Sequence, residues 1–510
     1  MSVKNISSAI LGVGVDDTTI DLFESQYPVP TGVSYNSYVI RDDKTAILDT
    51  VDDRATDEWL ANVTEALAGE KPAYLVVHHM EPDHSANMAR LAALYPEMQV
   101  VGNAKTFQYM EQFFGADAIA PERRVVVKDG ESLSLGTHTL TFVFAPMVHW
   151  PEVMVSYESS EKVLFSADGF GRFGAVAKFD EKADWASEAR RYYLNIVGKY
   201  GPQVQALLKK AAALDIQTIC PLHGPVLTGD LGKYLNYYDI WSSYKPEEPE
   251  KILVASASIH GHTRAAAHLM AEKLRAKGAK VVEVDLTRTD VSYAVTEAFR
   301  CGKIVLACAT YDGFLFPPME NLLTHLKTKN FQNRTVGLME NGTWAPMAAK
   351  LMRAELESMK NITLCENVVT IRSAANAAAE AEAAEYARKE QLEREKNAKL
   401  RGYNLAVQGY SGMASDQGSS LLVNIDNAVN AELGALDIRR IGENAVNNIR
   451  YEGELNAFQH RLNATQYLGE AANYKLQRNN LRANKYGSLM KNIFICLLYT
   501  SPSPRDRSLS

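Results

Sequence analysis

Short runs of β-branched and aromatic residues alternate with helix-like stretches over the first half of the chain. The runs at 38–40, 45–48, 74–77 and 125–127 have the length and composition of strands, and 54–68 and 85–94 have the apolar spacing of helices. Runs at 140–145, 163–166 and 218–221 also predict strands. This alternation predicts an α/β domain over residues 1–248.

A second alternation follows the charged, proline-containing segment 244–250, which we interpret as the domain boundary. Helical stretches such as 263–277 and 318–327 separate five apolar runs there. Five strands alternating with helices are typical of a doubly wound parallel sheet, so residues 251–372 predict a second α/β domain. Its predicted strands are 252–256, 280–285, 303–309, 335–340 and 363–370.

The composition changes after residue 373 to Ala, Glu, Asn, Gln and Arg, and no proline occurs between Pro346 and Pro502. This predicts a polar helical region over 373–490 and a separate tail over 491–510. The sequence up to about residue 489 resembles internal virion proteins of tailed phages, and the last fourteen residues resemble translated adapter DNA. We therefore expect an assembly chimera, with a native accessory helical domain as the alternative.

The bulk composition excludes several classes of protein. A chain of 510 residues with 46% hydrophobic content predicts several domains, and a net charge of -7 provides no basic surface for nucleic acid. No run approaches the ~20 apolar residues of a membrane span, and residues 9–15 lack a signal-peptide cleavage pattern. The five cysteines form no CxxC pair, which argues against a disulfide framework or a rubredoxin-like iron site and indicates a cytoplasmic protein.

The strongest chemical signal is the motif HHMEPDH at residues 78–84, placed between a predicted strand and a predicted helix. Three further candidate ligands each follow a predicted strand, where loops on a rigid sheet converge. Imidazoles and carboxylates together suit two metal ions with an open position, so we predict a dinuclear centre. His78 is expected to point away from it. The predicted ligands are His79, Glu81, Asp83, His84, His149, Asp168 and His223.

A phosphate-binding loop is predicted at 256–263, between the first strand and first helix of the second domain. Hydroxyl groups and helix N–H groups suit a phosphate that is held and not transferred, although an ordinary helix cap is the alternative. Loops 310–317 and 340–344 follow the third and fourth strands at the same sheet edge. Together the loops resemble the FMN site of flavodoxins. The resemblance implies cofactor contacts from Ser256, Ser258, Ile259, His260, Gly261, His262, Thr263, Thr310, Tyr311, Asp312, Gly313, Asn341, Gly342, Thr343 and Trp344.

Residues 3–372 as a whole resemble flavodiiron proteins, through the metal motif, segments 21–28, 35–38 and 148–152, and the flavin loops. The resemblance implies a metallo-β-lactamase-like αββα domain followed by a flavodoxin-like domain. It assigns one iron to His79, Glu81 and His149, the other to Asp83, His84 and His223, and the bridge to Asp168. Tyr192 and Tyr193 lie where the family has aromatics beside the irons. We expect Tyr193 to be catalytic together with Asp168, with helix packing as its alternative role.

The implied activity is an oxidoreductase that passes electrons through FMN to two iron ions and reduces dioxygen to water or nitric oxide to nitrous oxide. Because the chain has no CxxC, the electron donor is expected to be a separate rubredoxin-like protein. A head-to-tail homodimer or homotetramer is implied as well. The alternatives are a zinc-dependent hydrolase of the metallo-β-lactamase superfamily, which Glu81 disfavours because zinc hydrolases have His there, and a phage structural protein. The choice between the two gases stays open, since both use the same ligands.

Overall fold

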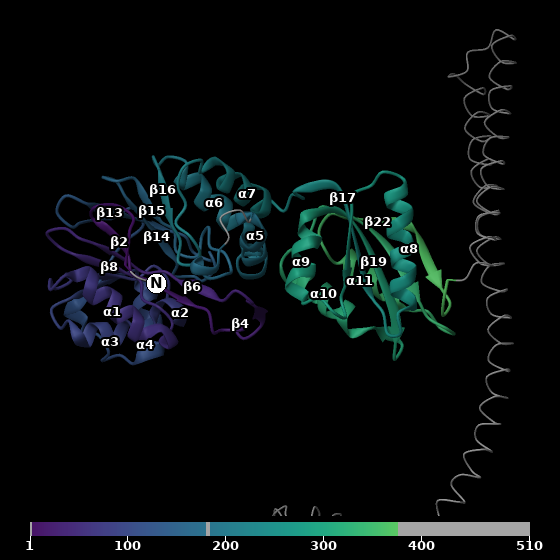
Figure 1. Ribbon diagram of the computed structural model, residues 1–510, viewed down its shortest axis with the longest axis horizontal. Coiled ribbons are helices and arrows are strands. Elements are labelled where there is room, and N and C mark those ends of the chain that lie inside the picture. The colour runs from purple at the N-terminus through teal and green to yellow at the C-terminus, as the bar shows by residue number, and fades with distance from the viewer. Residues whose placement is uncertain (1–2, 180–183, 376–510) are drawn as a thin grey trace, which may run out of the picture. The chain divides into compact units, whose positions relative to one another are not determined.

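Two facing β-sheets make up the first part of the protein, seen in a computed structural model that describes residues 3–179 and 184–375 (Figure 1). The larger sheet has the order β1-β2-β7-β8-β9-β10-β11 and the smaller one the order β12-β13-β14-β15-β16. The predictions made for residues 376–510, including the chimera, lie outside the described residues.

The strands of the larger sheet are short. They are β1 (Lys4–Asn5), β2 (Ile10–Gly12), β7 (Tyr38–Ile40), β8 (Ala46–Leu48), β9 (Tyr74–Val76), β10 (Gln99–Gly102) and β11 (Arg124–Val126). The smaller sheet contains β12 (Ser132–Ser134), β13 (Thr139–Phe144), β14 (Met154–Glu158), β15 (Val163–Phe165) and β16 (Thr218–Cys220). Two further pairs are β3 (Val15–Asp17) with β6 (Val33–Tyr35), and β4 (Leu22–Phe23) with β5 (Tyr27–Pro28).

Helices cover the outer face of each sheet. The helices of this part are α1 (Thr56–Leu67), α2 (Pro82–Ser85), α3 (Met88–Leu94), α4 (Ala104–Phe114), α5 (Trp185–Ile196), α6 (Gly201–Ala211) and α7 (Gly232–Ser242). Short 3₁₀ turns are η1 (Asp53–Ala55), η2 (Pro121–Arg123), η3 (Val176–Lys178) and η4 (Gly198–Tyr200). In Figure 1, α1, α3 and α4 lie beside the larger sheet, and α5, α6 and α7 lie on the other side, by the smaller one.

The side-chain alternation of the central strands explains this sandwich. In β7, Tyr38 and Ile40 belong to the core between the two sheets, whereas Val39 belongs to the core under α1, α3 and α4. In β9, Val76 faces the second sheet and Leu75 faces the helices. Successive strand residues point to opposite faces, so a strand buried on both faces reads as a continuous apolar run. The predicted αββα architecture is confirmed.

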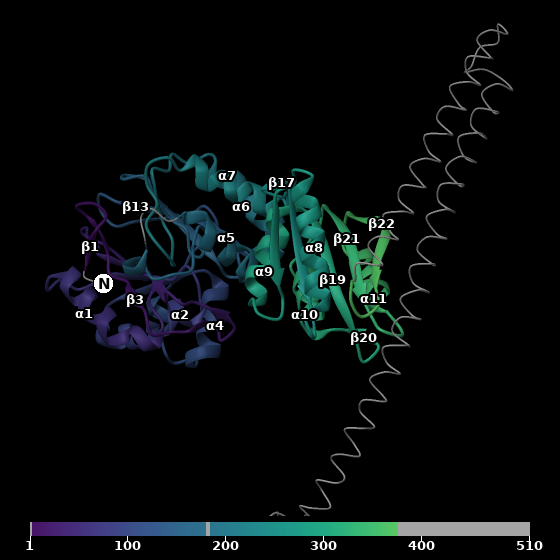
Figure 2. The same ribbon diagram turned by 45° about the vertical axis from the view of Figure 1, so that its right-hand side comes forward.

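The second part is a parallel sheet of order β18-β17-β19-β21-β22. Figure 2 shows β17, β19, β21 and β22 side by side. This is the flavodoxin order, and the prediction of five parallel strands is confirmed. The strands are β17 (Glu248–Ala257), β18 (Val281–Asp285), β19 (Cys301–Tyr311), β21 (Arg334–Asn341) and β22 (Ile362–Ile371), and a short β20 (Phe314–Leu315) pairs antiparallel with β19. The helices are α8 (His262–Ala276), α9 (Val291–Arg300), α10 (Pro317–Thr328) and α11 (Ala348–Glu357).

The two faces of this sheet are covered unequally among the described residues. α8 packs alone on the face formed by residues such as Val254 and Ala307. α9, α10 and α11 pack on the opposite face, which contains Leu253, Ile304 and Leu306. Successive residues of one strand therefore contact different helix layers, as the doubly wound arrangement requires.

The predicted linker 244–250 extends too far at its C-terminal end and is wrong there, because β17 already begins at Glu248. Glu248 pairs with Cys301 before the register shifts at Ile252. Its carboxylate lies 2.7 Å from Arg300 Nε and 3.0 Å from Lys251 Nζ. These cations compensate the charge, and the shift in register accommodates Pro249, which cannot donate to a ladder. The wider domain limits of 1–248 and 251–372 stay a prediction.

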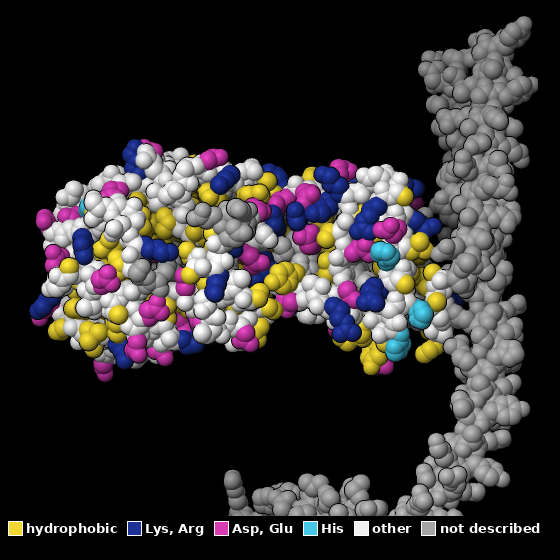
Figure 3. Space-filling view, in the orientation of Figure 1, with side chains coloured by type: hydrophobic (Ala, Val, Ile, Leu, Met, Phe, Trp, Pro, Cys, Tyr) yellow, Lys and Arg dark blue, Asp and Glu magenta, His cyan; other side chains and the backbone are white. Residues whose placement is uncertain are grey.

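The surface gives no sign of segregated charge on the face drawn in Figure 3, where basic and acidic side chains of the described residues are interspersed. Within the described ranges, no helix combines the length and apolar character needed to cross a membrane.

We expect Val76→Ala to lower the free energy of unfolding by about 2 kcal/mol, because it deletes two methyl groups from the fully buried layer between the sheets. Val126→Ala, in the same sheet but with a side chain 53% exposed, is the matched control and should cost less than about 0.5 kcal/mol. Chemical denaturation of the two variants measures the difference, and equal losses would show that this layer is not a packed core.

Candidate functional site

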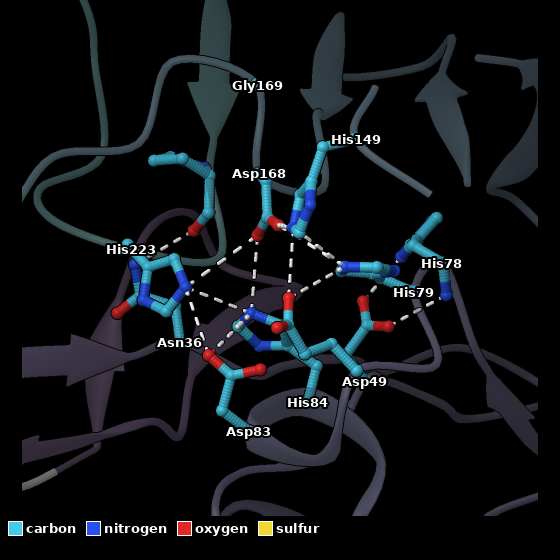
Figure 4. Close-up of polar contacts among 12 residues, drawn as sticks. Asn36, Asp49, His78, His79, Asp83, His84, His149, Asp168, Gly169 and His223 are labelled. Atoms are coloured by element: carbon cyan, nitrogen blue, oxygen red, sulfur yellow. Dashed lines mark hydrogen bonds and ion pairs between the residues drawn. The ribbon is translucent and has the colours of Figure 1, made fainter. Parts of the chain in front are cut away.

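Loops at the ends of strands from both sheets bring all seven predicted metal ligands together (Figure 4). One group of ligands comes from the loop and short helix that follow β9, and the others follow β13, β15 and β16. Six of the seven residues are no more than 8% exposed, and Glu81 is partly exposed. The cluster is thus buried with one more open side, at Glu81.

The first group consists of His79, Glu81, His149 and one oxygen of Asp168. Glu81 Oε2 lies 2.9 Å from His149 Nε2 and 3.2 Å from His79 Nε2. Asp168 Oδ2 lies 3.1 Å from His149 Nε2 and 3.4 Å from His79 Nε2. The two imidazole Nε2 atoms are 3.3 Å apart. Nitrogen and oxygen ligand atoms therefore converge on one point.

The second group consists of Asp83, His84 and His223. The Nε2 atoms of the two histidines are 3.0 Å apart, and Asp83 Oδ2 lies 3.3–3.4 Å from both. The other oxygen of Asp168, Oδ1, lies 3.2 Å from His84 Nε2 and 3.7 Å from His223 Nε2. Asp168 thus presents one carboxylate oxygen to each group.

The donor set fits two cations. Both carboxylate oxygens of Asp83 and of Asp168 are buried and, among the described residues, accept no well-formed hydrogen bond. Buried acceptors of this kind normally have a partner, and two imidazole nitrogens that face each other at 3.0–3.3 Å must share either a proton or a cation. A metal ion in each group would satisfy both conditions, and the mixture of nitrogen and oxygen ligands suits a redox-active transition metal.

Electrostatics keep the carboxylates charged. Burial alone would raise the pKa of Asp168, but His79, His149 and His84 outweigh it and hold that pKa well below its usual range. Burial likewise opposes protonation of His149, yet contacts with Asp168 and Glu81 raise its pKa to about 9. Asp168 is therefore an anion at neutral pH, the form in which a carboxylate binds metals.

Two groups outside the cluster contact the Nδ1 atoms of two imidazoles and so fix the orientation of these rings. His79 Nδ1 lies 2.7 Å from Glu152 Oε1, which also accepts a hydrogen bond from the Met80 N–H at 2.9 Å. His223 Nδ1 lies 2.9 Å from the carbonyl oxygen of Ser34. Such contacts leave Nε2 of each ring free to face the centre. Sequence reasoning missed Glu152 as a site residue, although it closes the segment 148–152; an acidic residue three positions after a candidate ligand was the available signal.

His78 turns away from the centre, as expected. Its Nδ1 lies 2.5 Å from Asp49 Oδ2 and its Nε2 lies 2.7 Å from Ser156 Oγ. All three side chains are essentially buried, so no substrate reaches this chain of contacts. It ties the end of β9 to β14 in the facing sheet.

The structure places Tyr193, which we expected to be catalytic, away from the metal ligands. The Tyr193 ring packs on Tyr238 and Trp241, with centroids 5.0 and 5.4 Å away. The Tyr192 ring instead lies 5.4 Å from the His223 ring, measured between centroids. The hydroxyls of both tyrosines are buried without a hydrogen-bond partner among the described residues. Neighbouring helix residues point about 100° apart, so only one of the two can face the centre. Tyr193 therefore has the packing role.

A second site lies at the carboxyl edge of the parallel sheet, where the three predicted loops enclose a cavity of about 650 Å³. Thirteen of the fifteen predicted cofactor contacts line it; they are Ser258, Ile259, His260, His262, Thr263, Thr310, Tyr311, Asp312, Gly313, Asn341, Gly342, Thr343 and Trp344. Ser256 and Gly261 do not. Ser256 is still within β17 and buried, and Gly261 serves the turn with a φ of +90°.

The first loop fits a phosphate group. Gly261 is the N-cap of α8 and supplies no side-chain hydrogen bond to the first helical turn. The N–H groups of that turn remain available to an anion, and the helix dipole favours negative charge there. Thr263, which is buried and lines the cavity, adds a hydroxyl. Beyond the loop, Trp344 is 85% exposed and Tyr311 is 45% exposed, so the cavity has aromatic groups at its rim.

Comparison with known proteins gives a consistent result. The family described as ODP family beta lactamase matches residues 33–224. The chain is 28% identical over 375 residues to a nitric oxide reductase of Moorella thermoacetica, covering 72% of this chain and 92% of that protein. It is 26% identical over 370 residues to a flavo-diiron protein of Clostridium acetobutylicum, covering 71% and 92%.

Among solved structures, the rubredoxin oxygen:oxidoreductase of Desulfovibrio gigas superposes with a TM-score of 0.69 at 27% identity, over 74% of this chain and 94% of that one. The similarity extends over both α/β parts described above. Over residues 3–372 this chain is therefore similar, in sequence and in structure, to flavodiiron proteins.

Proposed function

We propose that this protein is an oxidoreductase that passes electrons from a protein donor, through FMN, to a di-iron centre that reduces dioxygen to water or nitric oxide to nitrous oxide. The observation that carries the proposal is the position of Asp168, whose two oxygens lie 3.1–3.4 Å from His149 and His79 on one side and 3.2–3.7 Å from His84 and His223 on the other. One carboxylate shared by two ligand groups is the arrangement that two adjacent cations require.

In this proposal His79, Glu81 and His149 would hold one iron and Asp83, His84 and His223 would hold the other, with Asp168 as the ligand that the two would share. When bound, the iron pair supplies the redox chemistry and an open coordination position. Glu152 and the Ser34 carbonyl hold two of the imidazoles in the tautomer that directs Nε2 to a metal. Buried surroundings, including the Tyr192 ring, limit the access of water to the cluster.

The flavin would occupy the cavity at the edge of the parallel sheet. The first turn of α8 and the Thr263 hydroxyl would hold its phosphate, and the loops after β19 and β21 would flank its ring. FMN accepts electrons singly or in pairs, so it suits transfer between a one-electron donor and a multi-electron reduction. The zinc-hydrolase alternative accounts neither for this cavity nor for the carboxylate of Glu81, and nothing in the site favours it.

The proposal also covers the gas substrate, the electron donor, the location and the oligomeric state. The relatives from Moorella thermoacetica and Desulfovibrio gigas are named for nitric oxide and for rubredoxin with oxygen, which supports these as the candidate gases and donor class. The chain contains no CxxC, so the donor is proposed to be a separate rubredoxin-like protein. We also propose a cytoplasmic location and a head-to-tail homodimer or homotetramer.

The proposal is tested with the full chain, purified anaerobically and assayed with reduced rubredoxin and each gas in turn. We expect donor-dependent consumption of at least one gas by protein that contains both flavin and iron. Protein that contains both cofactors but consumes neither gas would contradict the proposed reaction, and zinc without flavin would favour the hydrolase.

Asp168→Ala is expected to lose both irons while keeping FMN. The variant removes a carboxylate whose two oxygens face the two ligand groups, whereas the flavin cavity is formed by a different sheet. Elemental analysis and the flavin absorption spectrum measure the two cofactors separately. Asp215→Ala, at an exposed aspartate, is the control and should keep both. Full iron occupancy in Asp168→Ala would exclude the bridging role.

Thr263→Val should weaken FMN binding about 10- to 150-fold and leave the iron content unchanged. The change keeps the shape of a buried side chain and removes a hydroxyl that would donate to a charged phosphate, worth about 1.5–3 kcal/mol. Thr324→Val, on the exposed face of α10, is the matched control. Flavin titration of the two apoproteins gives the affinities, and equal values would mean that the loop caps α8 without holding a phosphate.

A further inference from the structure

A second cavity, of about 390 Å³, lies away from the flavin site. It is enclosed between the smaller sheet of the first part, β12 to β16, and the helices α6 and α7. Val155, Leu164 and Ile219 form its floor on three neighbouring strands. Val204 and Leu208 of α6 and Leu231 before α7 are among the apolar side chains that cover it. The cavity is therefore enclosed mainly by aliphatic groups.

The few polar groups of its wall are already paired. The Ser166 hydroxyl donates to the Gly169 carbonyl oxygen at 2.6 Å, and the Tyr238 hydroxyl accepts the Phe170 N–H. The Asp239 carboxylate accepts from the Gln205 side chain at 3.0 Å. Polar groups are few in this wall, and apolar cavities of this kind bind small apolar molecules such as xenon.

Its inner wall is shared with the metal centre. Val148 and Gly169 line the cavity, and they are the chain neighbours of the metal ligands His149 and Asp168. Figure 4 shows Gly169 on the loop directly above Asp168. Both ligands belong to the group that also contains Glu81, so the cavity lies behind the two loops that carry this half of the cluster.

We propose that this cavity is a binding site for the dissolved gas substrate, from which dioxygen or nitric oxide passes between the His149 and Asp168 loops to the cluster. Both gases are small, neutral and weakly polar, so they partition into aliphatic space and need no hydrogen bond. The mainly aliphatic wall disfavours a charged or strongly polar metabolite. This inference rests on the proposed function, because it supplies the substrate of that reaction.

Xenon binding and gas kinetics together test the site in the full, cofactor-loaded protein. Val204→Phe places a ring into the cavity from a buried position of α6, and Ala211→Phe does so from the last turn of the same helix. Ala206→Phe, on the exposed side of α6, is the matched control. The second filling variant keeps the test available if Val204→Phe does not fold.

We expect saturable xenon binding, followed by xenon NMR, in the wild type and in Ala206→Phe, and its loss in both filling variants. The apparent KM for the gas should rise about three- to tenfold in those variants, with kcat, iron and flavin content unchanged. No xenon binding in the wild type, or an unchanged KM in a variant that has lost xenon, would overturn the proposal. So would an acyl chain found in the cavity by mass spectrometry.

Failure of the proposed function is distinguishable from failure of this site. If the loaded wild type reduces neither gas but binds xenon, the reaction is wrong and the supply role is refuted with it, while the apolar cavity itself is verified. If the wild type reduces a gas and binds no xenon, the reaction stands and the gas-binding site is wrong.

Discussion

The confinement of several ionisable side chains in one buried place is the constraint on which the rest of the structure depends. Asp168 and the histidines His79, His84 and His149 are withdrawn from water, and burial by itself would neutralise them. Their charged forms are retained because each faces opposite charge within the cluster. Asp168 has the central position, since one of its carboxylate oxygens faces each ligand group.

Such a cluster can only be built where rigid elements deliver side chains from several directions. The two sheets do this because both faces of their central strands are buried, one against helices and one against the other sheet. The strand ends are therefore packed on both sides, and short loops from them bring the ligands together. His78 points away from the cluster. Its contacts with Asp49 and Ser156 hold the end of β9 against β14.

The flavin cavity depends on a different structural feature, the edge of the parallel sheet and the N-terminus of α8. Parallel strands leave their loops at one edge, and the N-terminus of α8 offers unpaired N–H groups at that edge. The metal centre therefore uses charge compensation, whereas the flavin cavity uses backbone donors and aromatic rims. Because the metal centre and the flavin cavity are built on different sheets, changes at one are not expected to disturb the other.

The sequence by itself determined the fold class, the parallel strands of the second part and the seven candidate ligands, because apolar periodicity and a dense motif of metal-binding residue types are local signals. It did not determine which of Tyr192 and Tyr193 faces the centre, since that depends on the rotation of α5 against the sheet. It placed the start of β17 too late, because the charges of Glu248, Lys251 and Arg300 are neutralised only by pairing across the fold. Glu152 was missed for the same reason: its role comes from a contact with His79, seventy-three residues away, that only the tertiary structure creates.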